Sequence, residues 1–378
     1  MSKIFIITGE YSGNIHGAAV AKQLKLQMPD AEIEGIGAEA MAQEGVKLFS
    51  DHSKMSAVGL SPKIILEHIQ LGKRVVDYIL NDYNPEIVLL IDYGGFNMKI
   101  AKFLKEKGYV GKIYYYIPPQ VWASRKYRIK AIKKYIDKVL CIFPFEVDMY
   151  KEQGIDVHYC GHPLVSQLAP PADRAEFFAK HGLNSENPLI AVFPGSRKFE
   201  LKFLMKLFIK SAKILKRNHP DIQICFSQAP NLKDEVYSEF FKDCDFKLIK
   251  GENQALLSVA DSLILASGTV ALEAALYKTP LIISYKGPWL FYLVYLLVRA
   301  IDKVSLPNII CDRNIVPELV QGLAASDNIV FETERLLYDK TVRATQIESL
   351  EGVREKLSEK ISSYEVAQVV CETLKKGV

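Results

Sequence analysis

A phosphate-binding corner is the first chemical feature that the sequence suggests. Near the middle of the chain, the apolar run 189–193 ends in Pro194, Gly195, Ser196 and Arg197, and a helix-prone stretch follows. A strand that breaks through Pro-Gly into a helix leaves backbone N–H groups free, and an arginine adds a forked cation beside them. Gly195, Ser196 and Arg197 are therefore candidates for binding a phosphate or diphosphate. A plain turn with a surface arginine is the alternative.

A second candidate region follows the first apolar run of the chain. The segment from Gly9 to Gly17 carries Glu10, Ser12 and Asn14. Its glycines permit a tight turn with exposed amides, and the three side chains offer a carboxylate, a hydroxyl and an amide to a polar substrate. Helix capping by Ser12 or Asn14 is the alternative.

Asp92 is the candidate general base. It directly follows five apolar residues, and Asn97 comes five residues later. An acid at the end of a buried strand is held at the edge of the sheet, and partial loss of water there raises its pKa toward that of a useful base. The alternative is that Asp92 only caps the helix expected over residues 98–108.

Trp122 precedes a basic stretch beyond the next candidate strand. A run of cations is usually a solvated face, but a tryptophan beside cations also suits an anionic interface. The cations that follow Trp122 are Arg125, Lys126, Arg128, Lys130, Lys133 and Lys134.

The second half of the chain contains another helix start with exposed polar groups. Ser267, Gly268 and Thr269 offer N–H groups and hydroxyls there, and Glu273 lies one turn inside the helix. A carboxylate in that place can accept hydrogen bonds from vicinal hydroxyls such as those of a ribose. The polar loop of residues 305–318 is expected to complete this pocket. Its candidate substrate-binding residues are Asn308 and Glu318.

These residues need a framework that brings them to the edges of sheets. Short β-rich runs alternate with helix-length segments, which is typical of βαβ units with a buried parallel sheet. The rhythm breaks near residues 166–187 and then restarts, so we expect two doubly wound Rossmann-like α/β domains that face a cleft, because ligands bind at the strands' carboxyl ends. The domains are expected at 1–165 and 166–350, with a helical segment, 351–378, that packs back on the first. The expected strands are residues 3–8, 32–36, 86–91, 112–117, 138–143 and 157–160, then 189–193, 222–226, 246–249, 262–266 and 280–284.

The composition excludes several classes of protein. The 378 residues carry 48 basic and 44 acidic side chains, and the net charge of +4 is too small to indicate nucleic-acid binding. Six cysteines without a Cys-x-x-Cys pair predict neither a zinc site nor a disulfide framework. The first residues resemble a strand more than a signal peptide. The longest apolar run, residues 289–298, is about half of the roughly 20 residues that a spanning helix needs.

Eight motifs in order resemble the lipid-A-disaccharide synthase family, and the match extends from residue 4 to about residue 318. They include the strongest candidates above. The motifs are Gly-Glu-x-Ser-Gly from Gly9, Ile91-Asp92 before Phe96-Asn97, Pro119 to Trp122, Leu140 to Glu146, Gly161-His162-Pro163, Pro194 to Arg197, Ala266 to Glu273, and Ser305 to Asn308 with Val316 to Glu318.

The resemblance implies an inverting glycosyltransferase of the two-domain GT-B type. Such an enzyme condenses UDP-2,3-diacylglucosamine with 2,3-diacylglucosamine 1-phosphate, giving lipid A disaccharide 1-phosphate and UDP, without a metal or other cofactor. The first domain would then bind the acylated glucosamine phosphate acceptor and the second the UDP-sugar. The resemblance also implies a cytoplasmic protein, peripherally associated with the inner membrane, with the apolar run 289–298 and the basic stretch after Trp122 exposed. A homodimer is left open, and nucleic acid is not an expected partner.

Within this expectation the candidates take specific roles. Asp92 takes the proton from the acceptor 6-hydroxyl, and Glu10 is the second catalytic candidate. Arg197, the amides near Ser196 and the helix start at residues 267–269 stabilise the departing diphosphate. Glu273 holds the ribose. The remaining substrate-binding candidates are Ser12, Asn14, Asn97, Trp122, Gly195, Asn308 and Glu318.

Two departures and three alternatives accompany the resemblance. The chain has Asn14 where the family usually has Asp, and Gly94-Gly95 where Pro-Asp is typical, which bears on the pKa of the base and on the acceptor. A UDP-N-acetylglucosamine 2-epimerase-like enzyme would share the fold. A catalytically silent sugar-nucleotide or lipid-binding protein is also an alternative. A dehydrogenase would rest on Gly35, Gly37 and Ala40, whose position favours a turn over a dinucleotide loop.

Overall fold

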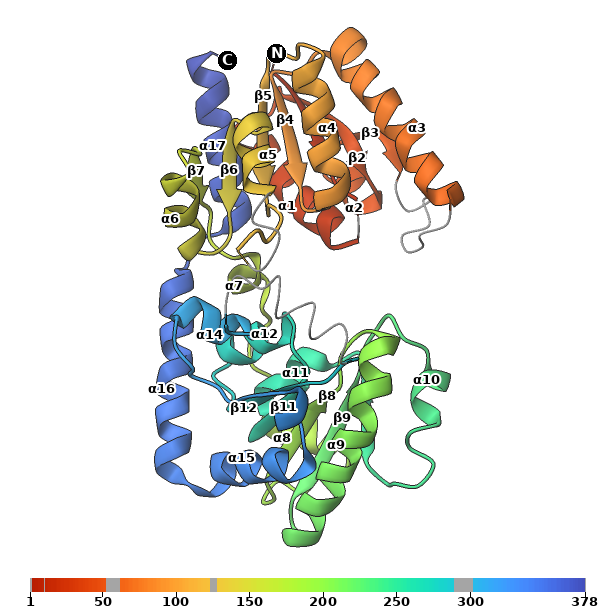
Figure 1. The fold of residues 1–378 in the computed structure, drawn as a ribbon, viewed down its shortest axis with the longest axis vertical. Helices are drawn as coiled ribbons and strands as arrows, with labels where there is room; N and C mark the ends of the chain where they lie inside the picture. Colours follow the sequence, from red (N-terminus) through yellow and green to blue (C-terminus); the bar gives the residue numbers. More distant parts are fainter. Residues whose placement is uncertain (1, 10, 52–61, 123–127, 289–301, 378) are drawn as a thin grey trace. The chain divides into compact units, whose positions relative to one another are not determined.

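The computed structural model describes residues 2–377 except residue 10 and the segments 52–61, 123–127 and 289–301. The chain forms two compact units (Figure 1), the first comprising Met1–Ser166 with Glu359–Val378 and the second Gln167–Ser358. Helix α16 (Lys340–Leu357) belongs to the second unit and runs through the boundary expected at residue 351. The chain therefore returns to the first unit only at Glu359.

The first unit is built on a parallel sheet whose strand order is β3-β2-β1-β4-β5-β6-β7. From β1 the chain winds outward to β2 and β3, and then crosses to β4 and winds the other way. Loops that follow β1 and β4 consequently leave the carboxyl edge side by side at a switch point, with Ile7 paired to Leu90. The strands are β1 (Lys3–Ile7), β2 (Glu32–Gly37), β3 (Lys47–Asp51), β4 (Ile87–Ile91), β5 (Lys112–Tyr116), β6 (Lys138–Cys141) and β7 (Val157–Tyr159).

Helices cover both faces of this sheet. The buried apolar face of α3, α4 and α5 packs on one side, whereas α1 and the C-terminal helix α17 pack against each other (Figure 1). The α17 hydroxyls of Ser362 and Thr373 hydrogen-bond those of Tyr116 and Tyr114 on β5, both at 2.7 Å. The described helices are α1 (Tyr11–Gln27), α2 (Glu39–Gln43), α3 (Pro62–Tyr78), the π-helical turn Ile79–Tyr83, α4 (Gly94–Glu106), α5 (Arg128–Tyr135), α6 (Phe145–Glu152), α7 (Pro163–Gln167) and α17 (Ser362–Lys376).

The second unit repeats the plan with strand order β10-β9-β8-β11-β12-β13, again parallel. Its switch point lies between β8 and β11, so the loops that carry Arg197 and Thr269 leave neighbouring strand ends. The strands are β8 (Leu189–Phe193), β9 (Gln223–Gln228), β10 (Lys247–Lys250), β11 (Ser262–Leu265), β12 (Leu281–Tyr285) and β13 (Glu318–Val320). The helices are α8 (Arg174–Lys180), α9 (Lys198–Asn218), α10 (Asp234–Ser238), α11 (Asn253–Val259), α12 (Val270–Leu276), α14 (Leu306–Cys311), the 3₁₀ turn Gln321–Leu323, α15 (Ser326–Tyr338) and α16.

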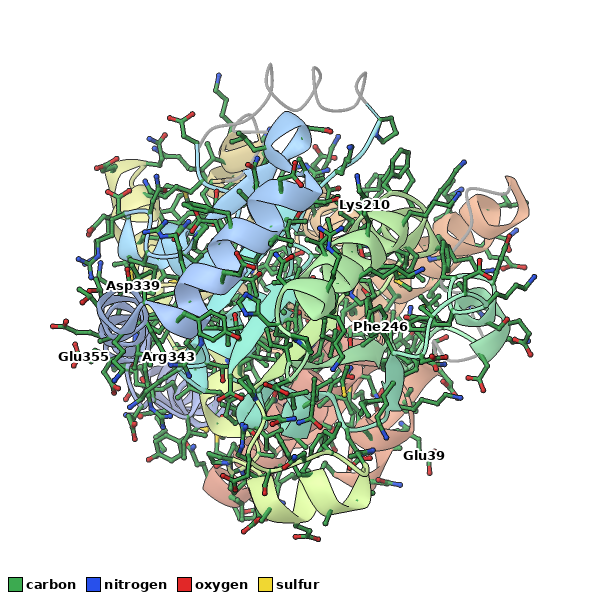
Figure 2. All side chains as sticks on the ribbon, turned by 90° about the horizontal axis from the view of Figure 1, so that it is seen from below. Glu39, Lys210, Phe246, Asp339, Arg343 and Glu355 are labelled. Atoms are coloured by element: carbon green, nitrogen blue, oxygen red, sulfur yellow. The ribbon has the colours of Figure 1, made fainter. Side chains whose placement is uncertain are left out.

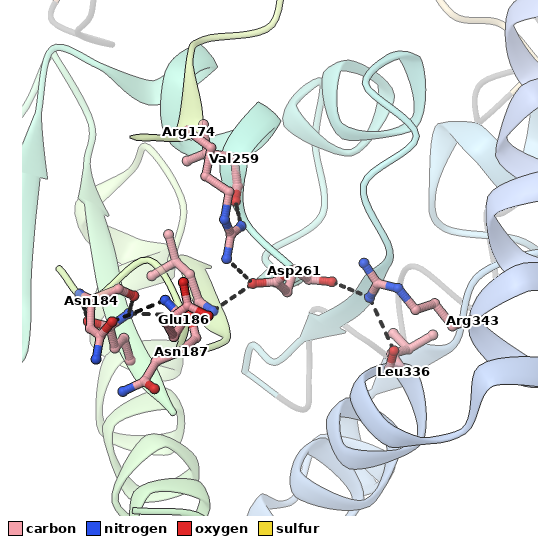
Figure 3. A network of polar contacts seen from close by, with 10 residues as sticks. Arg174, Asn184, Glu186, Asn187, Val259, Asp261, Leu336 and Arg343 are labelled. Atoms are coloured by element: carbon pink, nitrogen blue, oxygen red, sulfur yellow. Dashed lines mark hydrogen bonds and ion pairs between the residues drawn. The ribbon is translucent and has the colours of Figure 1, made fainter. Parts of the chain in front are cut away.

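Asp261 ties the amino edge of the second sheet together (Figure 3). Its carboxylate accepts hydrogen bonds from the Arg174 guanidinium of α8 and from the Leu189 N–H at the start of β8, both at 2.8 Å. Its main-chain oxygen accepts from Arg343 of α16 at 2.6 Å. One residue thus fixes two helices and two adjacent strands at the edge opposite the candidate site.

The two doubly wound parallel-sheet domains confirm the expected fold class. All eleven expected strands are present within one or two residues of their expected bounds. The sequence did not indicate β3 and β13. Strand β3 is a half-exposed edge strand and β13 has three residues, so neither shows the buried apolar run that identified the others.

Gly35 lies inside β2 and not in the expected turn. A Cβ atom built on it would lie 2.0 Å from the carbonyl oxygen of Ile6 in the neighbouring strand. The glycine therefore permits close pairing of β1 with β2, which explains the glycine spacing without a dinucleotide.

We expect Gly35→Ala to destabilise the protein by roughly 1–3 kcal/mol, because overpacking against main chain forces the strands apart. Urea unfolding of purified protein measures the change. Gly352→Ala, in open space on α16, is the matched control and should leave the stability equal or slightly higher. Equal unfolding midpoints for Gly35→Ala and the parent would contradict this packing argument.

Candidate active site

Asp92 and Tyr93 form a strained turn at the end of β4. Both have a left-handed backbone, each with φ of 50°. Two groups hold the turn: the Asn97 side-chain amide and the Tyr115 hydroxyl donate to the main-chain oxygen of Asp92, at 2.8 and 2.7 Å. Left-handed conformations outside glycine persist where surrounding bonds enforce them, and they concentrate at functional sites.

The carboxyl group of Asp92 has the environment expected of a base. Burial raises the pKa of Asp92, and a hydrogen bond from the Tyr93 N–H opposes part of that rise. The side chain lines a cavity together with Tyr93 and His68. Asp92 is not the helix cap considered as the alternative, because α4 already begins at Gly94 with Tyr93 at the N-cap and no capping side chain.

Asn97 does not occupy the substrate-contacting place expected for it. Its side chain is fully buried, and its amide group donates to the main-chain oxygens of Ile91 and Asp92. Asn97 therefore positions the turn that carries Asp92.

Tyr93 connects Asp92 to two other parts of the unit. Its ring covers Gly9, where an added Cβ would lie 2.0 Å from a ring carbon. Its hydroxyl forms a 2.5 Å hydrogen bond with Nε2 of His68 on α3. No sequence signal pointed to His68, since it lies 24 residues before Asp92 and on helix α3.

The polar residues of the first glycine turn have different surroundings. Glu10 lies outside the described residues. Ser12 is exposed on the first turn of α1. Asn14 is buried, and its side-chain oxygen accepts a 2.8 Å hydrogen bond from the Ala38 N–H, so it pins the loop after β2.

Trp122 is buried in the structure, which corrects the expectation of an exposed interface residue. Only 7% of it is exposed. Its indole N–H donates to Glu146 at 3.1 Å, and its ring meets Phe143 and Phe145 edge-on. The Glu146 carboxylate also accepts from the Phe143 N–H, and burial raises its pKa to about 7. A tryptophan whose indole N–H has an acceptor is stable when buried, even where the following residues are cationic.

The loop after β8 contains an internal anion. Glu200, in the first turn of α9, accepts hydrogen bonds from the N–H groups of Ser196 and Arg197, at 2.9 and 3.2 Å. Its other oxygen accepts from the Arg197 guanidinium at 3.2 Å. Gly195, with φ of 107°, leaves room for this carboxylate, because a Cβ there would lie 2.3 Å from it.

Glu200 thus takes the two amides that were expected to bind a diphosphate. The spacing of Glu200 from Arg197 is that of a capping box, a signal that could have revealed the bond. What remains for a ligand is the Arg197 side chain, of which 79% is exposed.

The loop after β11 keeps its polar groups accessible. Gly268 and Thr269 are exposed, and no atom lies within 4 Å of a Cβ built on Gly268. Ser267 donates through its hydroxyl to the Val304 carbonyl. Burial raises the pKa of Glu273, and a hydrogen bond with Gln254 opposes the rise.

Asn308 and Glu318 brace the neighbouring loop instead of facing a ligand. Asn308 is fully buried and uses both amide hydrogens and its oxygen within the loop, the hydrogens donating to Val316 and Glu318. The Glu318 carboxylate accepts from Ser305 and Val304 as well. The two polar segments expected to complete a pocket therefore satisfy each other's hydrogen bonds.

Two further observations concern the described residues. No described helix is long and apolar enough to cross a membrane. No group of three or more acidic, His or Cys side chains among them could hold a metal ion. The apolar run 289–298 lies outside the described residues.

Comparison with known proteins decides the family. The family model described as lipid-A-disaccharide synthetase matches residues 4–371. The lipid-A-disaccharide synthase of Geobacter sulfurreducens is 34% identical over 100% of this chain and 98% of its own length. That of Coxiella burnetii is 33% identical over 97% of each chain. The chain belongs to the lipid-A-disaccharide synthase family. The resemblance found in eight motifs is confirmed, and the family model extends it beyond residue 318.

Solved structures share the fold of this synthase-family chain. The UDP-GlcNAc 2-epimerase of Neisseria meningitidis, bound to UDP-GlcNAc, aligns with a TM-score of 0.66 at 13% identity, covering 99% of this chain and 100% of that one. A glycosyltransferase from Rickettsia africae aligns with a TM-score of 0.58 at 14% identity, covering 99% and 98%. At these identities the likeness concerns the fold, which glycosyltransferases and epimerases share, while the family favours the glycosyltransferase over the epimerase alternative.

Proposed function

We propose that this glycosyltransferase joins UDP-2,3-diacylglucosamine to 2,3-diacylglucosamine 1-phosphate and releases UDP. The full-length family match carries the proposal. The partly buried carboxylate of Asp92, in a strained turn beside a cavity, supports it with the group that the reaction needs.

The proposed chemistry divides between the two units. In the first, Asp92 accepts the proton of the acceptor 6-hydroxyl as that oxygen attacks the anomeric carbon, which inverts its configuration. Asn97 and Tyr115 hold the turn that carries Asp92. In the second, Arg197 and the accessible loop 267–269 stabilise the charge that develops on the departing diphosphate, and Glu273 accepts hydrogen bonds from the ribose.

Purified protein supplied with both acylated glucosamines should release UDP, and neither substrate alone should suffice. Asp92→Asn keeps the shape but removes the basicity, so turnover should fall about 10²–10⁴-fold. The rate of the parent should drop as the pH falls through a pKa above the ordinary 3.8 of an aspartate, since the protonated carboxyl cannot accept a proton.

Asp92→Asn should lose this acid limb of the pH profile while UDP binding persists. A folded Asp92→Asn variant with near-parental turnover would remove Asp92 from the mechanism. Absence of UDP release under all conditions would overturn the proposed reaction itself.

Arg197 is proposed to bind the diphosphate through its side chain alone. Arg197→Ala should weaken UDP binding about ten- to hundredfold, since a hydrogen bond to a charged group contributes ~1.5–3 kcal/mol. The affinity of Arg197→Lys for UDP should lie between those of the parent and Arg197→Ala, because lysine keeps the charge but lacks the planar fork. Calorimetric titration with UDP measures this, with Lys202→Ala, one turn along α9, as the matched loss of charge. Equal affinity of Arg197→Ala and Lys202→Ala would contradict the assignment.

Peripheral attachment to the cytoplasmic side of the inner membrane is part of the proposal. Both substrates carry acyl chains, and the exposed face of α9 is cationic. Lysines at spacings of three or four share that face, and Figure 2 marks Lys210 on it. Each such cation contributes about 1 kcal/mol of attraction to an anionic bilayer surface. The exposed cations of α9 are Lys198, Lys202, Lys206, Lys210, Lys213, Lys216 and Arg217.

The protein should cosediment with vesicles containing anionic lipid at low salt and less at high salt. Exchange of Lys202, Lys206 and Lys210 for Glu should abolish this binding. The same exchange at Lys233, Lys242 and Lys340, which are exposed elsewhere on the second unit, should reduce vesicle binding less than the exchange on α9. Equal loss in both triple variants would show that net charge, and not this face, governs attachment.

A further inference from the structure

A cavity of about 1050 Å³ lies along helices α3 and α4 of the first unit and reaches Asp92. Its volume is slightly above the roughly 300–1,000 Å³ typical of small-molecule pockets. The described residues that line it are His68, Ile69, Gly72, Lys73, Val76, Asp77, Asp92, Tyr93, Gly94, Gly95, Phe96, Lys99, Ile100, Lys102, Phe103 and Lys107.

The long walls of this cavity are apolar. Ile69 on α3 and Phe103 on α4 both line the cavity and are 47% and 48% exposed, so their apolar surfaces are open to an occupant. Gly72 lies between the helices, where an added Cβ would be 3.5 Å from Ile100 and 3.6 Å from Phe96. The absent side chain at Gly72 therefore keeps the groove open.

The rim of the cavity is basic. Four of its lining residues are lysines, and only Asp77 and Asp92 are acidic. Lys107 pairs with Asp77 at 3.0 Å. Lys73 and Lys99 are exposed and have no ion-pair partner in the described part of the chain. An occupant with an apolar body and an anionic group would match both the walls and the rim.

We propose that this cavity binds an acyl chain of the sugar-phosphate acceptor, with Lys73 and Lys99 attracting its phosphate. The proposal rests on the proposed function, because Asp92 at the end of the cavity is the group that receives the acceptor's proton. A sugar whose hydroxyl reaches Asp92 has its attached chain next to the apolar walls. A bare sugar or nucleotide would leave those walls in contact with water.

Binding can be measured without catalysis. Decyl phosphate, decanol and inorganic phosphate separate the contributions of chain and charge. Calorimetry of the full protein gives their affinities, with decyl phosphate kept below its critical micelle concentration and decanol below its solubility limit. Decyl phosphate should bind most tightly, decanol more weakly and inorganic phosphate least. Equal weak binding of all three probes would overturn the proposal.

Gly72→Leu tests the groove directly, because a leucine there projects between the helices. It should weaken decyl phosphate binding at least tenfold, whereas Gly72→Ala, whose methyl group fits at ordinary contact distance, should have a small effect. Gly352→Leu on α16 is the matched control with no neighbour within 4 Å. Unchanged binding in a folded Gly72→Leu protein would place the chain elsewhere.

The rim has its own variant. In the double variant Lys73→Gln with Lys99→Gln, the affinity for decyl phosphate should fall to about the affinity of the parent for decanol. The affinity for decanol itself should not change. Lys233→Gln with Lys242→Gln is the control for the same loss of charge. If the rim variant weakened decanol equally, the lysines would act on folding and not on the phosphate.

Turnover with a series of acceptors separates this proposal from the proposed function. In acceptors with butanoyl, hexanoyl, octanoyl and decanoyl chains, each added methylene should lower KM about fourfold, until the groove is full. Gly72→Leu should flatten that dependence. If UDP was released and KM depended on chain length equally in the parent and in Gly72→Leu, the acyl site alone would be overturned. If none of these acceptors supported UDP release although decyl phosphate still bound and Gly72→Leu weakened that binding, the proposed reaction would be overturned instead.

One competing outcome concerns the membrane. If Gly72→Leu and the rim variant changed vesicle cosedimentation but neither decyl phosphate binding nor the acceptor series, the groove would be a bilayer contact and the acyl-site proposal would be wrong.

Discussion

Two hydrogen bonds to one carbonyl oxygen hold the candidate base in place. Asp92 and Tyr93 both adopt a left-handed backbone, which costs roughly 1–3 kcal/mol for each residue outside glycine. Asn97 from α4 and Tyr115 from β5 offset this by donating to the Asp92 oxygen from buried positions. The turn can therefore form only when the helix and the next strand are already packed. The position of the carboxylate depends on the assembled sheet and not on local sequence preference.

The loops at the switch points of the two sheets carry their carboxylates in different ways. Each places loops from two adjacent parallel strands at a switch point, where helix starts leave N–H groups without partners. In the first unit a carboxylate at that edge, Asp92, remains free of ion pairs in the described part of the chain, and burial raises its pKa. In the second unit the buried carboxylate of Glu200 occupies the N–H groups and orients Arg197. A fixed internal anion of this kind satisfies the N–H groups of the loop and leaves the Arg197 side chain exposed to a ligand.

The framework followed from the sequence because strands buried on both faces have a simple signature. All eleven apolar runs that were interpreted as strands are strands, and Asp92 was placed correctly at the end of one. The errors arose where partners distant in sequence determine the outcome. Trp122 is buried because Glu146 offers an acceptor, and Asn308 turns inward because Glu318 and the 315–316 amides satisfy it. The bond of His68 to Tyr93 depends on the packing of α3 against α4, for which periodicity gives no register.

The fold alone does not select the chemistry of this chain. A TM-score of 0.66 to an epimerase shows that the same pair of doubly wound sheets serves more than one reaction. At the sheet edge the loops and helices of this chain add a carboxylate on a turn that Asn97 holds, and beside it a groove that Gly72 keeps open between apolar walls. A reaction confined to the sugar nucleotide has no need of such a groove. In the acyl-site proposal the amphiphilic acceptor fills the groove, and its apolar part lies against the same helix, α4, that supplies Asn97 to the turn of the base.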